Sequence, residues 1–220
     1  SGGQAAMSLR DNGYEGRIIM VGKEPYLPYE RPPLSKSTLR ADSRLPLMAS
    51  SDIYNAKSIE VLLSTTVIGL DTSKRRIDLD DGSQLTYEKL LLATGAVVRR
   101  LNIPGCEKGN IHFLRTYDDA IAIKKKLIPG NRLVVIGGGF IGLEAAASAS
   151  ELGCRVSVVE TGSQLMGRVV PKIIADYFEE LHREHGVTVH LGETPVALLG
   201  DGQVSGVALS TGAQLKADLV

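Results

Sequence analysis

The chain has 220 residues, of which 43% are hydrophobic and 23% are charged, and it contains no tryptophan. This composition is typical of a globular chain with one large domain or two smaller ones, and it excludes disordered and collagen-like proteins. Lys plus Arg and Asp plus Glu both number 25, so the formal net charge of zero argues against nucleic-acid and anionic-membrane partners.

The first half of the chain predicts a helix, a buried strand, a proline-rich loop and a small antiparallel sheet. A helix over residues 4–10 and a strand within residues 16–22 flank an Asn-Gly turn. Residues 24–36 contain four prolines, so they cannot form a regular helix and must be either an ordered loop or a disordered one. Short apolar runs between turn residues predict further strands at 61–63, 66–70, 76–79 and 90–93. We expect a domain boundary near Pro104.

The second half alternates between helical and strand patterns. The spacing of apolar residues predicts helices over 118–127, 140–152 and 171–185, the last of them ended by Gly186. Strands are predicted at 132–136, 155–159, 187–191, 203–209 and 214–220. Ile173, Ile174, Tyr177, Phe178 and Leu181 share one face of the last helix, which we expect to pack in the core. The fold class is therefore α/β, with two Rossmann-like dinucleotide-binding domains and a small antiparallel excursion.

A glycine motif follows strand 132–136 and opens the next predicted helix. It reads Gly137-x-Gly139-x-x-Gly142, and Glu160 closes the following strand, 18 residues past Gly142. The first glycine permits a tight turn, the second lets the backbone approach a pyrophosphate, and the third allows close packing of helix and strand. Glu160 would accept hydrogen bonds from ribose hydroxyls and repel a 2′-phosphate. The motif predicts an NADH site; the alternative is a glycine-rich turn that binds nothing.

Cysteine usage and the absence of long apolar runs bear on localisation. The two cysteines, Cys106 and Cys154, are too far apart for a CxxC motif and too few for a disulfide-rich secreted scaffold. No apolar run approaches the roughly 20 residues that cross a bilayer, and the first residues lack the features of a signal peptide. We therefore expect a cytoplasmic protein with no membrane partner.

Four stretches resemble the FAD-dependent pyridine nucleotide reductases that act on ferredoxin and rubredoxin, a group that includes the putidaredoxin reductases, dioxygenase reductase components and apoptosis-inducing factor. They read GGQAAMSLRDNGYEGRIIMVGKEPYLPYERPPLSK, LLLATGAVVRRLNIPG, GGGFIGLE and LMGRVVPKIIADYFEELHREHGV. The resemblance implies an FAD-binding domain over residues 1–104 and an NAD-binding domain over residues 105–220. It also implies a fragment of a longer reductase, with both domains truncated.

The same resemblance implies site residues, position by position. It places FAD on Gly2, Glu24, Arg31, Lys36, Val67, Thr94, Gly95 and Arg99. Together with the glycine motif, it places NADH on Gly137, Gly138, Gly139, Phe140, Ile141, Gly142, Glu160 and Arg168. Lys36 and Glu144 are implied to be the catalytic pair, in which the carboxylate holds the lysine near flavin N5 and the lysine stabilises charge that develops on reduction. The alternative for each charged residue is a solvated surface position.

The resemblance implies an enzyme that passes hydride from NADH to FAD and then single electrons to a [2Fe–2S] ferredoxin serving an oxygenase or P450. Three alternatives stay open: a rubredoxin reductase, a nitrite reductase module, and a non-catalytic flavoprotein of the apoptosis-inducing factor kind. A disulfide substrate is not expected, because the chain has no closely spaced cysteine pair. We assign no metal, because the four histidines lack carboxylate or cysteine neighbours at ligand spacing.

Overall fold

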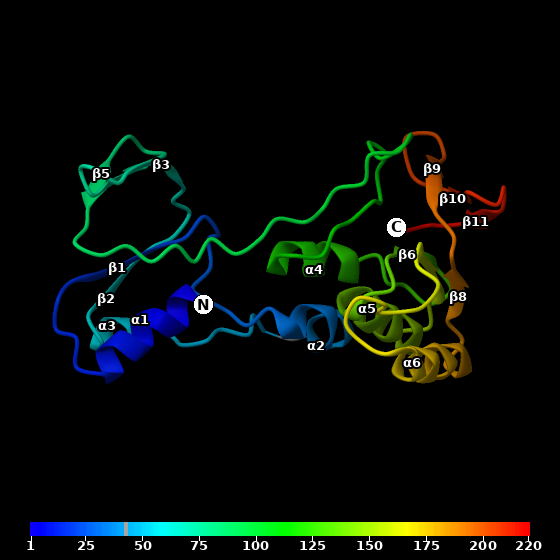
Figure 1. The fold of residues 1–220 in the computed structure, drawn as a ribbon, viewed down its shortest axis with the longest axis horizontal. Coiled ribbons are helices and arrows are strands. Elements are labelled where there is room, and N and C mark those ends of the chain that lie inside the picture. Colours follow the sequence, from blue (N-terminus) through cyan, green and yellow to red (C-terminus); the bar gives the residue numbers. More distant parts are fainter. Residues whose placement is uncertain (42–43) are drawn as a thin grey trace. The chain divides into compact units, whose positions relative to one another are not determined.

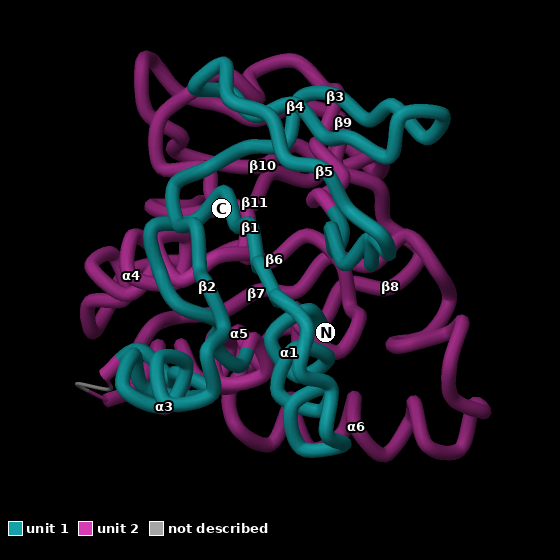
Figure 2. The backbone as a smooth tube through the Cα atoms, turned by 90° about the vertical axis from the view of Figure 1, so that its left-hand side faces the viewer, with its two compact units in different colours: residues 1–30, 45–96 teal, residues 31–44, 97–220 magenta. Residues whose placement is uncertain are grey.

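The computed structural model describes residues 1–41 and 44–220, which form two compact units (Figure 1). Unit 1 comprises residues 1–30 and 45–96, and unit 2 comprises residues 31–44 and 97–220 (Figure 2). The segment 31–44 thus belongs to the same compact unit as the second half of the chain. The assignment of FAD to residues 1–104 and of NAD to residues 105–220 stays a prediction. Within the described residues, no helix has both the length and the apolar character that a membrane span requires.

Unit 1 combines a short parallel strand pair with a separate antiparallel sheet. Strand β1 pairs with β2 in parallel, and β3, β4 and β5 form the antiparallel sheet that was expected as an excursion. Ala6 of the first helix packs with Ile18, Tyr54 and Ile59 in a small core. The elements are α1 (Gly2–Asp11), β1 (Ile18–Val21), α3 (Ser51–Ala56), β2 (Ile59–Leu62), β3 (Val67–Asp71), β4 (Arg76–Leu79) and β5 (Gln84–Thr86).

The strand expected at residues 90–93 is wrong. This segment has no regular secondary structure, and Leu91 and Leu92 are each 65% exposed. An extended segment becomes a strand only when a neighbouring strand satisfies its N–H and C=O groups. No strand among the described residues pairs with 90–93. The run is apolar, as the sequence analysis observed, but composition alone could not indicate that no neighbouring strand pairs with it.

Unit 2 contains the predicted parallel sheet with a helix between its first two strands. Strands β6, β7 and β8 are parallel and adjacent in that order, and α5 connects β6 to β7. A second sheet, β11-β10-β9, is antiparallel, and its first strand in the chain was missed by the sequence analysis. The elements are α4 (Tyr117–Lys124), β6 (Arg132–Ile136), α5 (Phe140–Glu151), β7 (Arg155–Glu160), α6 (Lys172–Glu184), β8 (Thr188–Leu191), β9 (Pro195–Leu199), β10 (Gly206–Leu209) and β11 (Gln214–Lys216).

Helix α6 buries a different face from the one expected. Ile173 is 76% exposed and Tyr177 is 59% exposed, whereas Ala175 and His182 are buried. The helix contacts β8. Apolar spacing identifies residues that share a helix face, but it does not identify which face the neighbouring strand covers. The expectation that this apolar stripe lies in the core is therefore wrong for its exposed members.

The proline-rich segment is ordered and packs within unit 2. It forms a 3-10 helix, η1 (Pro32–Ser35), followed by the short helix α2 (Ser37–Arg40). Both contact α4 and α5, and Leu34 and Leu39 are 3% and 0% exposed. The prolines start η1 because their fixed φ suits the first helical turn and their missing N–H groups would have no partner there. Of the two states left open for this loop, the structure has the ordered one.

Leu39→Ala should lower the free energy of unfolding of the chain by about 2–5 kcal/mol, because it removes a fully buried side chain and leaves a cavity. Urea denaturation followed by circular dichroism measures this loss. Leu47→Ala is the matched control, since Leu47 is 42% exposed, and it should cost less than about 1 kcal/mol. Equal losses for the two variants would contradict the docking of segment 31–44.

Asp218 fixes the start of β6 through Arg132. Its Oδ2 atom accepts hydrogen bonds from the backbone N–H and Nε of Arg132 at 2.9 and 2.8 Å, and its Oδ1 atom accepts from Nη2 at 2.5 Å. The side-chain hydrogen bonds from Arg132 are the main cause that lowers the pKa of Asp218 to about 2. A carboxyl pKa depressed by folding stabilises the folded state above its unfolded value of about 3.9. That stabilisation is lost as the pH falls through about 2.

Asp218→Asn should therefore lower the free energy of unfolding at pH 7 by about 1 kcal/mol, a small value because solvent screens the half-exposed pair. The difference from the wild type should shrink as the pH falls from about 4 towards 2. Denaturant unfolding at several pH values checks this. Asp176→Asn, which breaks an exposed pair with Lys172, is the control. A difference that stays constant down to pH of about 2 would contradict the prediction.

Candidate functional site

The glycine motif forms a tight turn between β6 and α5. Gly137 has φ +109°, a backbone conformation that favours glycine. A Cβ atom on Gly142 would lie 2.1 Å from the carbonyl oxygen of Gly137 and 3.2 Å from Cγ1 of Val135. A Cβ atom on Gly139 would meet nothing within 4 Å. The backbone conformation at Gly137 and the close packing at Gly142 therefore favour glycine within the chain itself, whereas Gly139 leaves open space beside the turn.

The amino end of α5 presents unpaired donors. Among the residues that the structure describes, the N–H groups of Gly139, Phe140 and Ile141 donate to no backbone carbonyl. These groups and the helix dipole together favour an anion. The open space beside Gly139 leaves room for the anion to approach. The turn therefore fits the pyrophosphate of a dinucleotide.

Glu160 lies at the carboxyl end of β7, beside the glycine turn. Its Oε2 atom accepts a hydrogen bond from the N–H of Gly138, and its Oε1 atom accepts one from the N–H of Gly162, both at 2.7 Å. Oε1 also accepts a hydrogen bond from the Thr161 hydroxyl at 3.3 Å, so the carboxylate is held in a fixed orientation with further acceptor capacity on Oε2. This arrangement fits the predicted contact with ribose hydroxyls.

Lys36 and Glu144, which are 108 positions apart in the sequence, form an ion pair within unit 2. Lys36 Nζ lies 2.7 Å from Oε2 of Glu144, and the Ser35 hydroxyl donates to the same oxygen at 2.5 Å. Burial disfavours the charged carboxylate, but the hydrogen bonds from Lys36 and Ser35 outweigh it, so the pKa of Glu144 is lowered. The contact expected from the resemblance is present, and its catalytic role stays a prediction.

The remaining predicted FAD residues occupy both units. In unit 1, Gly2 is the first residue of α1, and Val67 is the first residue of β3 and is 43% exposed. Glu24 follows β1, and its carboxylate accepts a hydrogen bond from the Tyr29 hydroxyl. In unit 2, Arg31 donates to the carbonyl oxygen of Arg115 at 2.6 Å.

Four other predicted residues lie in irregular segments. Thr94, Gly95 and Arg99 belong to the extended stretch after β5 and are exposed, and Gly95 has φ +72°. Arg168 is exposed in the turn between β7 and α6. Thr94 and Gly95 belong to unit 1, Arg99 and Arg168 belong to unit 2, and their cofactor roles stay predictions.

The sequence analysis missed three residues that hold the site together. Gly162 binds Glu160 through its N–H group, Ser35 binds Glu144, and the Ser148 hydroxyl donates to the carbonyl oxygen of Ser35 at 2.8 Å. Ser35 directly precedes Lys36, so its neighbourhood was a usable signal. Ser148 looked like one small residue in an alanine-rich helix, and no sequence signal distinguished it.

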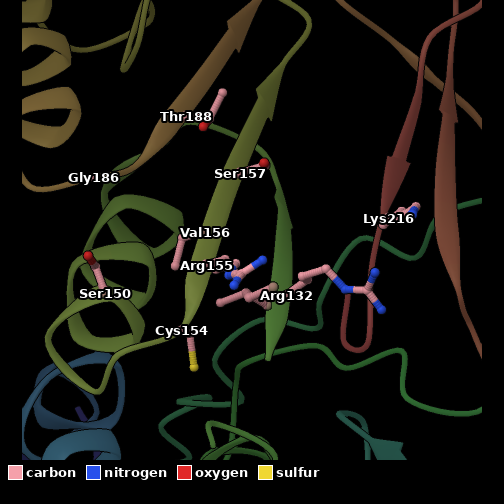
Figure 3. Close-up of a pocket in the computed structure, with 10 residues that line it drawn as sticks. Arg132, Ser150, Cys154, Arg155, Val156, Ser157, Gly186, Thr188 and Lys216 are labelled. Atoms are coloured by element: carbon pink, nitrogen blue, oxygen red, sulfur yellow. The ribbon is translucent and has the colours of Figure 1, made fainter. Parts of the chain in front are cut away.

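A cavity of about 340 Å³ opens at the other end of the parallel sheet, at the starts of β6, β7 and β8 (Figure 3). Its charged lining residues are Arg132, Arg155 and Lys216, and none of the predicted site residues is among the described residues that line it. Ligands of open α/β sheets bind outside the carboxyl ends of the strands. The cavity lies at the opposite end of the strands from the glycine turn, so the binding of NADH at the turn stays the prediction for this sheet.

The sequence pattern of the pyridine nucleotide-disulphide oxidoreductases matches residues 1–220. The ferredoxin–NAD(+) reductase subunit of the benzene 1,2-dioxygenase system of Pseudomonas putida is 38% identical over 219 residues, covering 99% of this chain and 53% of that protein. The rubredoxin–NAD(+) reductase of the same species is 37% identical over 224 residues, covering 100% of this chain and 58% of that protein.

A solved structure is also similar. The covalent complex of putidaredoxin reductase with putidaredoxin contains a chain that matches with a TM-score of 0.94 at 36% sequence identity, covering 99% of this chain and 54% of that one. This chain spans about half the length of the curated relatives it matches.

Proposed function

This chain belongs to the pyridine nucleotide-disulphide oxidoreductase family, and we propose that it works in an FAD-dependent NADH:ferredoxin reductase. Its part in that enzyme is to bind NADH at the glycine turn and to hold a lysine–carboxylate pair beside the flavin. The similarity to a ferredoxin–NAD(+) reductase over 99% of the chain supports the reaction class.

One observation carries the proposal. Phe140 opens α5 at the glycine turn, and Glu144 lies four residues later on the same helix, bound to Lys36 at 2.7 Å. Residues four apart in a helix lie on the same face, one turn of about 5.4 Å from each other. The end of the helix that fits a pyrophosphate and the carboxylate that holds Lys36 are therefore parts of one helix.

Each part of the site has its own role in the proposed function. The N–H groups at the start of α5 bind the pyrophosphate, and Glu160 orients the ribose and disfavours a 2′-phosphate. Glu144 holds the Lys36 ammonium, whose positive charge stabilises negative charge that develops next to it. Bound FAD supplies a ring that takes up hydride from NADH and releases electrons one at a time.

We infer a small iron–sulfur protein as the electron acceptor. The family includes disulfide reductases, but both cysteines of this chain are free thiols, Cys154 is buried, and burial raises the pKa of its thiol. A raised pKa disfavours the thiolate needed for disulfide exchange. The similarity to a rubredoxin reductase makes rubredoxin the second candidate acceptor. Free thiols and the proposed reaction both suit the cytoplasm.

Reconstitution tests the proposal. The intact protein that contains residues 1–220 is incubated with FAD, freed of excess cofactor and mixed with NADH, and reduction of a [2Fe–2S] ferredoxin and of a rubredoxin is followed in parallel. Faster reduction of the ferredoxin is expected. Preference for rubredoxin would support the second candidate. Slow NADH oxidation that neither carrier accelerates would contradict both and favour a non-catalytic flavoprotein.

A further inference from the structure

We propose that Ser35 is a positioning residue, which holds the Glu144 carboxylate so that one of its oxygens meets the Lys36 ammonium. The Ser35 hydroxyl donates to Glu144 Oε2 at 2.5 Å, and Lys36 Nζ lies 2.7 Å from the same atom. The inference rests on the proposed function, because it concerns the ion pair assigned to the flavin.

The two partners of the Glu144 carboxylate, Ser35 and Lys36, differ in how deeply they are buried. Ser35 is 4% exposed, whereas the side chains of Lys36 and Glu144 are 42% and 31% exposed. Water and salt compete for a half-exposed ion pair, so such a pair fixes its own geometry poorly. A short hydrogen bond from a buried hydroxyl to a carboxylate is charge-assisted, and because its donor is buried it faces less competition from water. Ser35 therefore sets the orientation of the carboxylate, and Lys36 follows it.

Ser35 is itself held in place by α5. Its carbonyl oxygen accepts a hydrogen bond of 2.8 Å from the Ser148 hydroxyl, and Ser148 is 2% exposed. Glu144 and Ser148 are four residues apart, so they lie on one face of the helix. Ser35 thus binds this face twice, through its hydroxyl to Glu144 and through its carbonyl to Ser148. Only the first of these bonds touches the carboxylate.

Other charges near this contact have partners elsewhere. On α2, Arg40 pairs with Glu151 of α5 at 2.7 Å, and at the start of η1 Arg31 binds the Arg115 carbonyl. On α4, the Lys124 ammonium donates to the carbonyl oxygen of Ala41. Besides burial, which raises it, the pKa of Glu144 is set by Lys36 and Ser35, both of which lower it. That pKa therefore responds to the serine contact as well as to the Lys36 pair.

The test measures the Glu144 carboxyl in the 220-residue chain without cofactor. Glutamate labelled with ¹³C at the carboxyl carbon is incorporated, the Glu144 signal is assigned with Glu144→Gln, and its pKa is determined by NMR titration. Ser35→Ala should raise this pKa, because burial remains and one stabilising donor is gone. Ser148→Ala is the matched control, since it removes one hydroxyl from an equally buried serine between the same two segments without removing the donor to the carboxylate, and it should raise the pKa less than Ser35→Ala does.

The FAD-loaded chain gives a second readout. Ser35→Ala should lower the rate of flavin reduction at saturating NADH about tenfold with little change in KM, because Ser35 is not part of the glycine turn. If Ser35→Ala does not fold, Ser35→Cys keeps a weak donor at the same position and should give a smaller rise of the pKa.

Two results would overturn the inference: an unchanged Glu144 pKa in the Ser35 variants that fold, or equal shifts in Ser35→Ala and Ser148→Ala. A shifted pKa in a chain that never reacts with NADH would instead contradict the proposed function and leave the positioning role standing.

Discussion

Gly142→Ala should weaken NADH binding by about 100-fold. The new Cβ atom would lie 2.1 Å from the Gly137 carbonyl oxygen, closer than any tolerated contact, and Cγ1 of Val135 blocks a second direction at 3.2 Å. Because both obstacles lie in β6 and the turn after it, the start of α5 must move away from the strand. The N–H groups that face the pyrophosphate move with it. Quenching or enhancement of NADH fluorescence on titration measures the dissociation constant.

Alanine substitutions at two other glycines distinguish a displaced helix from direct obstruction of the ligand as the cause of this loss of binding. Gly139→Ala meets nothing within the chain, so it should keep the free energy of unfolding and weaken NADH binding only by obstructing the ligand. Gly22→Ala also has open space and an ordinary backbone conformation in unit 1, so it should change neither property. Wild-type NADH affinity in Gly142→Ala would show that this turn does not hold the dinucleotide.

Lys36→Met should slow NADH-dependent flavin reduction by about 100-fold or more, with a KM for NADH close to that of the wild type. The variant removes the positive charge that Glu144 holds at 2.7 Å and leaves the half-buried carboxylate without its cationic partner. In the proposed function the charge acts on the reacting groups and not on the glycine turn, so the rate should change more than the affinity. Anaerobic stopped-flow absorbance at about 450 nm, where oxidised flavins absorb, measures the rate.

Lys172→Met is the matched control for this variant. Lys172 also forms a short pair with a carboxylate, Asp176, at 2.6 Å, but it lies on the exposed side of α6. Its loss should leave the flavin reduction rate within about twofold of the wild type. Similar rates for Lys36→Met and Lys172→Met would mean that the Lys36–Glu144 pair stabilises only the packing of segment 31–44.

Local pattern predicted the sheet that carries the glycine turn closely. Strand β6 has the predicted bounds, and α5 and β7 each differ from the prediction by one residue at one end. Gly186, with φ +79°, follows the end of α6 as the stop signal indicated. These elements depend on the spacing of nearby apolar residues, on helix and strand propensity, and on glycines at positions whose backbone conformation favours glycine. The sequence therefore predicts them directly.

Features that depend on distant partners could not be predicted in this way. Residues 90–93 have a strand's composition without a neighbouring strand, and α6 turns Ile173 and Tyr177 outwards because the sheet covers another face. The Lys36–Glu144 contact joins segments 108 positions apart, and only the family resemblance suggested it. The Ser148 hydroxyl that binds the Ser35 carbonyl had no signal at all.

Amide NMR of the isotope-labelled chain, titrated with NADH and separately with NADPH, tests the central claim most directly. The account predicts that NADH shifts the amide signals of Gly138, Gly139 and Phe140, and that NADPH shifts them far less because Glu160 repels its 2′-phosphate. No shift at the turn, or shifts confined to the cavity lined by Arg155 and Lys216 at the other end of the sheet, would contradict it.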